Sequence, residues 1–276
     1  MSITVFQRAI CRLIAANRIA SGESYVAGGV ALNTLIDSPR QSTDIDLFHD
    51  AQEAVAAAWL ADNTLLERAG YQVNVRRQLP VFVEALVAKG QEEVLIQWAQ
   101  DSAYRFFPLQ EHADFGLTLH PFDLATNKVL ALVGRLEVRD WIDVIACHES
   151  IQNLGYLAWA AAGKDPGFSP PFILEEAARS ARYTQIEIDA MSFESSPPSA
   201  VKLSQRWRII LNEAREMVDS LPVREVGTCV LNRSGELLQA PPADLRALLE
   251  SGAVRFHSGC IRGAYPQILS TQTRHD

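Results

Sequence analysis

The sequence predicts an α+β protein, in which a small mixed β-sheet flanked by helices is followed by a mainly helical C-terminal region with a short β-hairpin. Helical and period-two apolar patterns alternate through the first 100 residues, as they do where helices pack on a sheet. Beyond residue 120, nearly all apolar patterns are helical. A cluster of Gly, Pro and Ser at 161–171 interrupts these patterns, which predicts one domain over residues 1–160 and a second region over residues 172–276.

The first 100 residues alternate between the two patterns. An amphipathic spacing predicts an N-terminal helix. "SYVAGGVALN" (24–33) predicts a strand end, a glycine turn and a helix that continues to about residue 35. The alternation in "TDIDLFHD" (43–50) predicts a strand, and a helix closed by Gly70 follows it. Three further strands are expected at 71–78, 81–90 and 92–101, with a turn at Lys89-Gly90 between the last two.

The second half is expected to be mostly helical. Residues 120–150 predict a helix that is either continuous or broken near Leu136–Val138, and Pro121 suits its first turn. Residues 172–220 predict helices interrupted by the loop "FESSPPS". A hairpin around Asn232–Gly235 and a short helix in "PPADLRALLESG" complete the chain.

Composition restricts the class of protein. The chain has 276 residues, of which 48% are hydrophobic and 21% charged, so it can bury a core and is not disordered. Its net charge of −8 means that any nucleic-acid substrate would have to meet a local basic patch. The four cysteines are far apart and form no CxxC pair, which argues against a metal knuckle and against a disulfide framework.

Targeting signals are not expected. The N-terminal apolar residues are interrupted by arginines and lack the features of a secretory signal. No apolar run approaches the ~20 residues of a membrane span, so we expect a cytoplasmic protein with no membrane partner.

Two aspartates share one face of the predicted strand at 43–50. Residues i and i+2 of a strand point the same way, so Asp44 and Asp46 should project side by side. Like charges at that spacing repel, and a fold tolerates them best where a cation lies between them. Mg²⁺ takes one or two protein carboxylates and fills its other positions with water and substrate phosphates. The pair therefore predicts a Mg²⁺ site.

The glycine turn upstream suits phosphate. Gly28 and Gly29 permit backbone conformations that are closed to other residues and allow close approach to a ligand. The turn precedes a helix N-terminus, where free N–H groups and the helix dipole bind anions. Either motif alone is usually a plain turn or a solvated loop. Together, in this order, they predict a site for a nucleoside triphosphate.

These residues resemble a known superfamily. A Gly-Gly turn followed by an Asp-x-Asp strand is similar to nucleotidyltransferases of the DNA-polymerase-β type. "AGGVALN…RQSTDIDLF" and "NKVLALVGRLEVRDWIDV" (127–144) more closely resemble the AbiEii/AbiGii toxin-like nucleotidyltransferases. That family shows a GGxAL turn, a Ser-x-Asp-Ile-Asp-Leu strand and a helical Lys-x-x-Ala-Leu…Arg…Arg-Asp-x-x-Asp segment. The resemblance covers about residues 20–150 and implies a nucleotidyltransferase fold.

The resemblance also implies residue roles. Gly28 and Gly29 would hold the triphosphate with help from the hydroxyl of Ser42, while Lys128 would neutralise phosphate charge. Asp143, with Asp140, would complete the pocket or orient Lys128 and Arg139. Taken alone, the pattern of residues 128–143 is also typical of an exposed helix with i,i+4 ion pairs. The implied catalytic residues are Asp44, Asp46, Lys128 and Asp143, the metal ligands are Asp44 and Asp46, and the nucleotide-binding residues are Gly28, Gly29, Ser42, Lys128 and Arg139.

The implied activity is Mg²⁺-dependent transfer of a nucleoside monophosphate from ATP, GTP or CTP to a tRNA, another RNA or a protein, by a toxin with an antitoxin partner. Many members of the superfamily carry a third carboxylate on a later strand, which can activate the attacking hydroxyl. The expected position here is Gln97, with Asp101 and Glu93 of the same parity as candidate substitutes. The alternative function is a catalytically decayed module that binds nucleotide or a partner.

Overall fold

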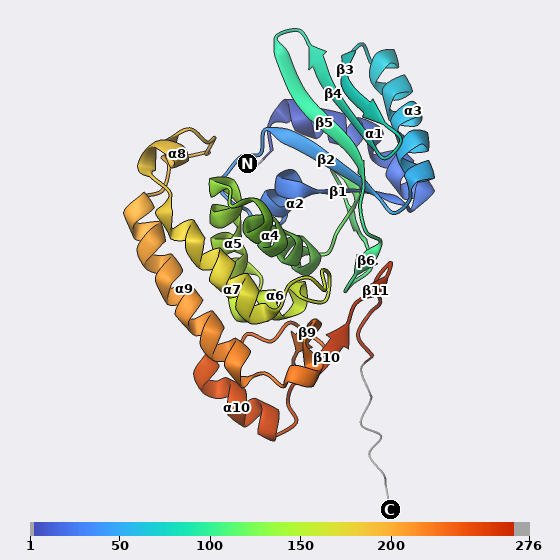
Figure 1. Ribbon diagram of the computed structural model, residues 1–276. Helices are drawn as coiled ribbons and strands as arrows, with labels where there is room; N and C mark the ends of the chain where they lie inside the picture. The colour runs from blue at the N-terminus through green and yellow to red at the C-terminus, as the bar shows by residue number, and fades with distance from the viewer. Residues whose placement is uncertain (1–2, 268–276) are drawn as a thin grey trace, which may run out of the picture.

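A seven-stranded mixed sheet forms the centre of the N-terminal half in the computed structural model, which describes residues 3–267 (Figure 1). The strand order is β3-β4-β5-β2-β1-β8-β7. β2 runs parallel to β5 and β1 parallel to β8, whereas the other neighbouring strands are antiparallel. The strands are β1 (Ser24–Ala27), β2 (Asp44–His49), β3 (Gln72–Leu79), β4 (Phe82–Lys89), β5 (Glu92–Gln100), β7 (Gln110–His112) and β8 (Gly116–Thr118).

Helices α1 (Val5–Ser21) and α3 (Gln52–Arg68) cover the apolar face of this sheet. Alternate residues of β2 and β5, such as Ile45 and Trp98, are fully buried against them. Trp98 lies edge-on to Trp59 of α3, with the ring centroids 4.8 Å apart, and its Nε1 donates to Asp62 at 2.9 Å. The period-two pattern of the sequence thus identified the buried face, and Asp44 and Asp46 alternate with it onto the opposite face.

The opposite face meets α2 (Gly28–Leu35) and α4 (Pro121–Arg135). The predicted helix at 120–150 takes the broken form. Leu136 adopts a left-handed conformation at φ +52°, its N–H caps Leu132, and α5 (Val138–Ser150) begins in a new direction. The break places the acidic residues of α5 against the basic residues of α4, which an unbroken helix would have kept on one surface.

The C-terminal helices pack on α4 and α5. Figure 1 shows α4 to α7 gathered beside α2, with α9 along their outer side. Buried residues of α6 contact both α4 and α9, so apolar packing continues across the predicted linker at 161–171. The division into 1–160 and 172–276 stays a prediction. The helices are α6 (Leu154–Ala161), α7 (Pro170–Ala178), α8 (Gln185–Asp189), α9 (Ala200–Ser220) and α10 (Pro242–Glu250), with 3₁₀ turns at Arg179–Arg182 and Val223–Glu225.

The predicted α+β class with a mixed sheet is confirmed, but two details differ. β7, β8 and β6 (Tyr104–Arg105) were not predicted, because strands of two or three residues are too short for a period-two pattern. The turn after Asn232 forms, and the backbone N–H of Asn232 donates to the carbonyl oxygen of Glu236 at 2.8 Å. However, β9 (Thr228–Leu231) pairs along its length with the distant β10 (Arg255–Ser258), and the expected return strand supplies only a single bridge.

One more short strand was not predicted. β11 (Cys260–Ile261) pairs with β6. All four cysteines are free thiols. Within residues 3–267, no helix is both long and apolar enough to cross a membrane.

Candidate active site

The glycine turn lies directly against the two aspartates. β1 ends at Ala27, which is paired in register with Asp46, and Gly28 begins α2 at φ +64°. A Cβ atom added at Gly28 would lie 1.7 Å from Asp46 Oδ2, and one added at Gly29 would lie 2.7 Å from Ser42 Oγ. No side chain fits at either position without moving a polar group. The structure therefore brings the two predicted motifs into one site.

Substitution of Gly28 tests this close approach. Gly28→Ala should combine the cost of a left-handed Ala, about 1–2 kcal/mol, with displacement of Asp46, so both stability and turnover should fall. Gly22→Ala is the matched control, because Gly22 has φ +66° but nothing within 4 Å of an added Cβ. Urea unfolding and turnover measured for both variants should separate them. Equal losses in the two variants would contradict the close approach.

Asp44 and Asp46 differ in their surroundings. Ser42 Oγ donates to Asp44 Oδ1 at 2.8 Å, and Arg139 Nη1 lies 3.8 Å from Asp44 Oδ2. Burial raises the pKa of Asp46 to about 6, and the negative charge of Asp44 adds to the increase. An ionised Asp46 is thus destabilised, which is the expected state of a carboxylate pair that shares a cation.

The donor set fits Mg²⁺. Two adjacent carboxylates are the hard oxygen ligands that Mg²⁺ prefers, with water and phosphate completing its coordination. Within residues 3–267, no cluster of three or more His, Cys, Asp and Glu side chains could hold a metal, so a closed zinc-type site is not found there.

The raised pKa of Asp46 predicts a stability change. Because the folded pKa exceeds the ordinary value of 3.8, protonated Asp46 favours folding, and this contribution is lost as the pH rises through about 6. Asp46→Asn should therefore increase the free energy of unfolding at pH 7.5 by about 1–2 kcal/mol without metal. The gain should shrink toward zero near pH 4. Denaturant titrations at both pH values, in EDTA, check this; a less stable variant at pH 7.5 would contradict it.

A buried ion network lies behind the aspartates. Lys128 Nζ on α4 lies 3.1 Å from Asp140 and 3.0 Å from Asp143, both fully buried on α5. Arg135 forms two bonds to Asp140, at 2.6 and 2.9 Å. Arg40 forms two bonds to Asp143, at 2.6 and 2.8 Å. Burial alone would lower the pKa of Lys128, but the charges of Asp143 and Asp140 outweigh it and hold the pKa above its ordinary value. The lysine is therefore protonated.

The network assigns contacts that differ in part from those implied by the resemblance. Asp143 contacts Lys128, as implied, but its second partner is Arg40 rather than Arg139. Arg139 instead forms an ion pair with Glu137, with Nε 2.6 Å from Oε2, and approaches Asp44. Asp143 is thus a buried support that holds two cations.

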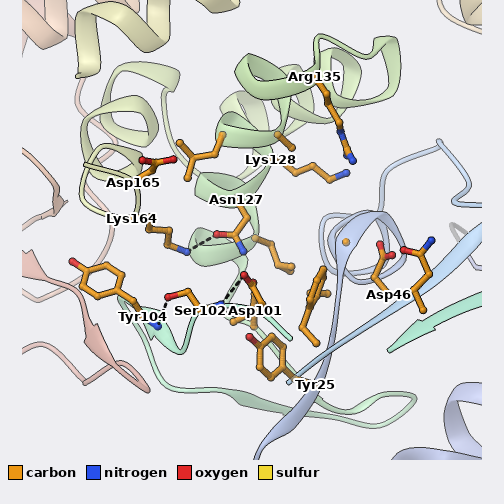
Figure 2. Close-up of a pocket in the computed structure, with 18 residues that line it drawn as sticks. Tyr25, Asp46, Asp101, Ser102, Tyr104, Asn127, Lys128, Arg135, Lys164 and Asp165 are labelled. Atoms are coloured by element: carbon orange, nitrogen blue, oxygen red, sulfur yellow. Dashed lines mark hydrogen bonds between the residues drawn. The ribbon is translucent and has the colours of Figure 1, made fainter. Parts of the chain in front are cut away.

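Two cavities meet at the aspartates. The smaller, about 210 Å³, is lined by polar groups, and the larger, about 420 Å³, adds aromatic and aliphatic side chains. Asp46, Gln97, Lys128 and Arg135 line both. Figure 2 shows the larger cavity, with Asp46, Lys128 and Arg135 at one end and Tyr104 and Lys164 at the other. The smaller cavity is also lined by Gly29, Arg40, Ser42, Asp44 and Arg139.

The far end of the larger cavity contains residues that sequence reasoning missed. Lys164, in the predicted linker, bonds Asp123 at 2.8 Å and donates to Asn127 Oδ1 at 2.7 Å. Because Lys164 engages the amide oxygen of Asn127, the amide nitrogen of that residue is left as a hydrogen-bond donor. Burial raises the pKa of Asp101, which lines the same cavity.

The third-carboxylate position is occupied by an amide. Gln97 on β5 is paired in register with Asp46, and its Nε2 donates to Glu84 on β4 at 2.9 Å. Glu93 is exposed at the start of β5. Sequence reasoning missed Glu84, although the Lys89-Gly90 turn sets a register in which Glu84 faces Gln97.

A protein-family model described as "Nucleotidyl transferase AbiEii toxin, Type IV TA system" matches residues 15–213. Among solved structures, MenT4, a nucleotidyltransferase toxin from Mycobacterium tuberculosis H37Rv, superposes with a TM-score of 0.51 at 16% identity, covering 78% of this chain and 83% of that one. An H. pylori protein assigned as a nucleotidyltransferase gives a TM-score of 0.50 at 12% identity, covering 78% and 95%. No curated protein matches the chain in sequence.

The two structures support the fold, and the family model covers most of the chain, including the glycine turn, the aspartate strand and the α4–α5 network. The chain is a nucleotidyltransferase and belongs to the AbiEii toxin family of type IV toxin–antitoxin systems.

Proposed function

We propose that this protein transfers a nucleoside monophosphate from a nucleoside triphosphate to an acceptor hydroxyl in a Mg²⁺-dependent reaction. The observation that carries the proposal is the meeting of Asp44 and Asp46 with protonated Lys128 and Arg135 where the two cavities join. Mg²⁺ would be held by the two aspartates, and when bound it neutralises phosphate charge and stabilises the charge that develops during transfer.

The polar cavity suits the triphosphate. Arg139 and the N-terminus of α2 offer hydrogen-bond donors around it, and Ser42, which donates to Asp44, also lines it. Four cationic side chains line it beside the two carboxylates, so it can accept an anionic triphosphate within a protein of net charge −8. The larger cavity, with Tyr25, Phe48 and Tyr104, has the mixed lining that a nucleoside requires.

The chemical step needs little covalent participation by the protein. The acceptor oxygen forms a bond to the α-phosphorus while the bond from that phosphorus to the pyrophosphate oxygen breaks. Lys128 and Arg135, which line both cavities, would offset the negative charge that accumulates on the leaving pyrophosphate. The buried carboxylates of Asp140 and Asp143 hold these cations in place before substrate arrives, which is electrostatic preorganisation.

The biological setting follows from the family. We propose that the acceptor is an RNA, with tRNA as the first candidate and a protein as the second, and that an antitoxin is the physiological partner. Nucleoside triphosphates and RNA are both available in the cytoplasm, which is the proposed location.

Pyrophosphate release tests the proposal. Each nucleoside triphosphate should be incubated with total RNA, with Mg²⁺ or with EDTA. Pyrophosphate should appear only with the metal and with the RNA together. Release that persists in EDTA would overturn metal dependence, and release of inorganic phosphate instead of pyrophosphate would overturn nucleotidyl transfer.

A further inference from the structure

Four polar side chains form a row across four neighbouring strands. Arg77 on β3 pairs with Glu84 on β4, Glu84 pairs with Gln97 on β5, and Gln97 pairs with Asp46 on β2. Directly paired residues of adjacent strands point to the same face of a sheet. The row therefore leads along the site face of the sheet from an exposed edge strand to Asp46.

The hydrogen bond to Glu84 fixes the orientation of the Gln97 amide. An ionised carboxylate only accepts hydrogen bonds, so it selects the amide nitrogen of Gln97, and the Nε2 to Oε2 distance is 2.9 Å. β4 and β2 lie on opposite sides of β5. With Nε2 held by Glu84 on β4, Oε1 is left on the side of the amide away from Glu84, and Gln97 is paired with Asp46 of β2 on its other flank.

The partner of this oxygen must be a hydrogen-bond donor. Gln97 lines both cavities at the point where they join. An amide oxygen is an acceptor only, so it repels phosphate oxygens and carboxylates and attracts a hydroxyl. In the proposed reaction, the attacking hydroxyl of the acceptor is a donor of this kind.

We propose that Gln97 Oε1 accepts a hydrogen bond from the attacking hydroxyl and so positions it beside Asp46, and that Glu84 is the positioning residue that holds the amide in this orientation. The inference rests on the proposed function and specifies how the acceptor is bound. The hydroxyl oxygen forms its bond to the α-phosphorus as the bond to pyrophosphate breaks. Its proton passes to water, because a neutral amide does not take it.

The amide also avoids a cost that an acid would bring. A third carboxylate beside Asp44 and Asp46 would add a like charge, and one placed within hydrogen-bond distance of Glu84 would repel that group as well. Gln97 thus supplies the hydrogen bond without the charge.

Three variants test the proposal in transfer of α-labelled nucleotide to total RNA. Gln97→Met keeps the length of the side chain but removes the acceptor, and kcat/KM for RNA should fall about 10-fold or more. Glu84→Gln permits either amide orientation and should cause a smaller loss, about 3-fold. Gln100→Met, an exposed position on the same strand, is the control and should match the wild type.

The charge-swapped double variant Glu84→Gln/Gln97→Glu distinguishes a positioning role of Gln97 from a purely structural one. It keeps the net charge and a carboxylate–amide pair, so it should recover activity relative to Gln97→Glu alone. It should also acquire a new ionisation in its pH–rate profile, because the residue beside the hydroxyl is now titratable.

A measurement of metal affinity distinguishes a Gln97 that positions the hydroxyl from a Gln97 that binds the metal. Mn²⁺ affinity, measured by electron paramagnetic resonance, should be unchanged in Gln97→Met; a large loss would make Gln97 a metal ligand and overturn the proposal. Full transfer activity in Gln97→Met would overturn it while leaving nucleotidyl transfer intact. If the wild type transfers no label to RNA or to protein, the proposed function fails and the positioning role fails with it.

Discussion

Asp44→Asn and Asp46→Asn should each lower nucleotidyl transfer about 10³-fold, on the order of 4 kcal/mol of transition-state stabilisation. Each change removes one of the two carboxylates proposed to bind Mg²⁺ while keeping the shape of the side chain. Asp46→Asn also removes a group whose pKa burial has raised to about 6, so the fold should not suffer. Turnover with saturating nucleotide and Mg²⁺ measures the effect.

The control for these variants is Asp219→Asn, which changes an exposed carboxylate on α9 far along the chain from the aspartate strand. It should retain wild-type turnover. If Asp44→Asn and Asp46→Asn both retained the turnover of Asp219→Asn and the wild type, a metal site at this strand would be contradicted.

Asp143→Ala should cause the largest loss of stability, about 3–5 kcal/mol. It removes a fully buried carboxylate that compensates both Arg40 and Lys128, two cations that are themselves almost entirely buried. Lys128→Ala should be different, because Asp140 retains Arg135 and Asp143 retains Arg40. Its stability loss should be smaller, while turnover should fall about 10²–10³-fold, as for loss of one preorganised charge.

Urea unfolding and turnover, measured on both variants, separate support from catalysis. Glu176→Ala serves as the reference, because it breaks a partly exposed pair with Arg179 and should cost less than about 1 kcal/mol. An Asp143→Ala protein as stable as Glu176→Ala would contradict the assignment of Asp143 as the buried support of the site.

The local parts of the site were predictable from sequence. The alternation of Ile45 and Leu47 with the aspartates identified both the strand and its polar face, and the glycine pair identified the turn that meets it. These predictions depend on residues close together in the chain, where periodicity and turn chemistry are informative.

The parts that depend on distant residues were missed. Arg40 lies in the loop between α2 and β2, and its partner Asp143 is 103 residues away. Lys164 lies in a segment whose Gly and Pro content predicts a linker, yet its side chain is buried in an ion pair with Asp123. No local pattern encodes such contacts. Glu84 is an intermediate case. The register of the β4–β5 hairpin places it opposite Gln97, and this register can be predicted by counting residues back from the turn.

In the proposed reaction, the α-phosphoryl group and its nucleoside move to an acceptor. The most direct measurement compares one nucleoside triphosphate labelled at the α-phosphorus with the same nucleotide labelled at the γ-phosphorus, each incubated with total RNA or with protein and Mg²⁺. The α-label should enter the acceptor and the γ-label should appear in pyrophosphate, and both signals should vanish in Asp46→Asn. Transfer of the γ-label to the acceptor, or nucleotide binding without transfer of either label, would contradict nucleotidyl transfer.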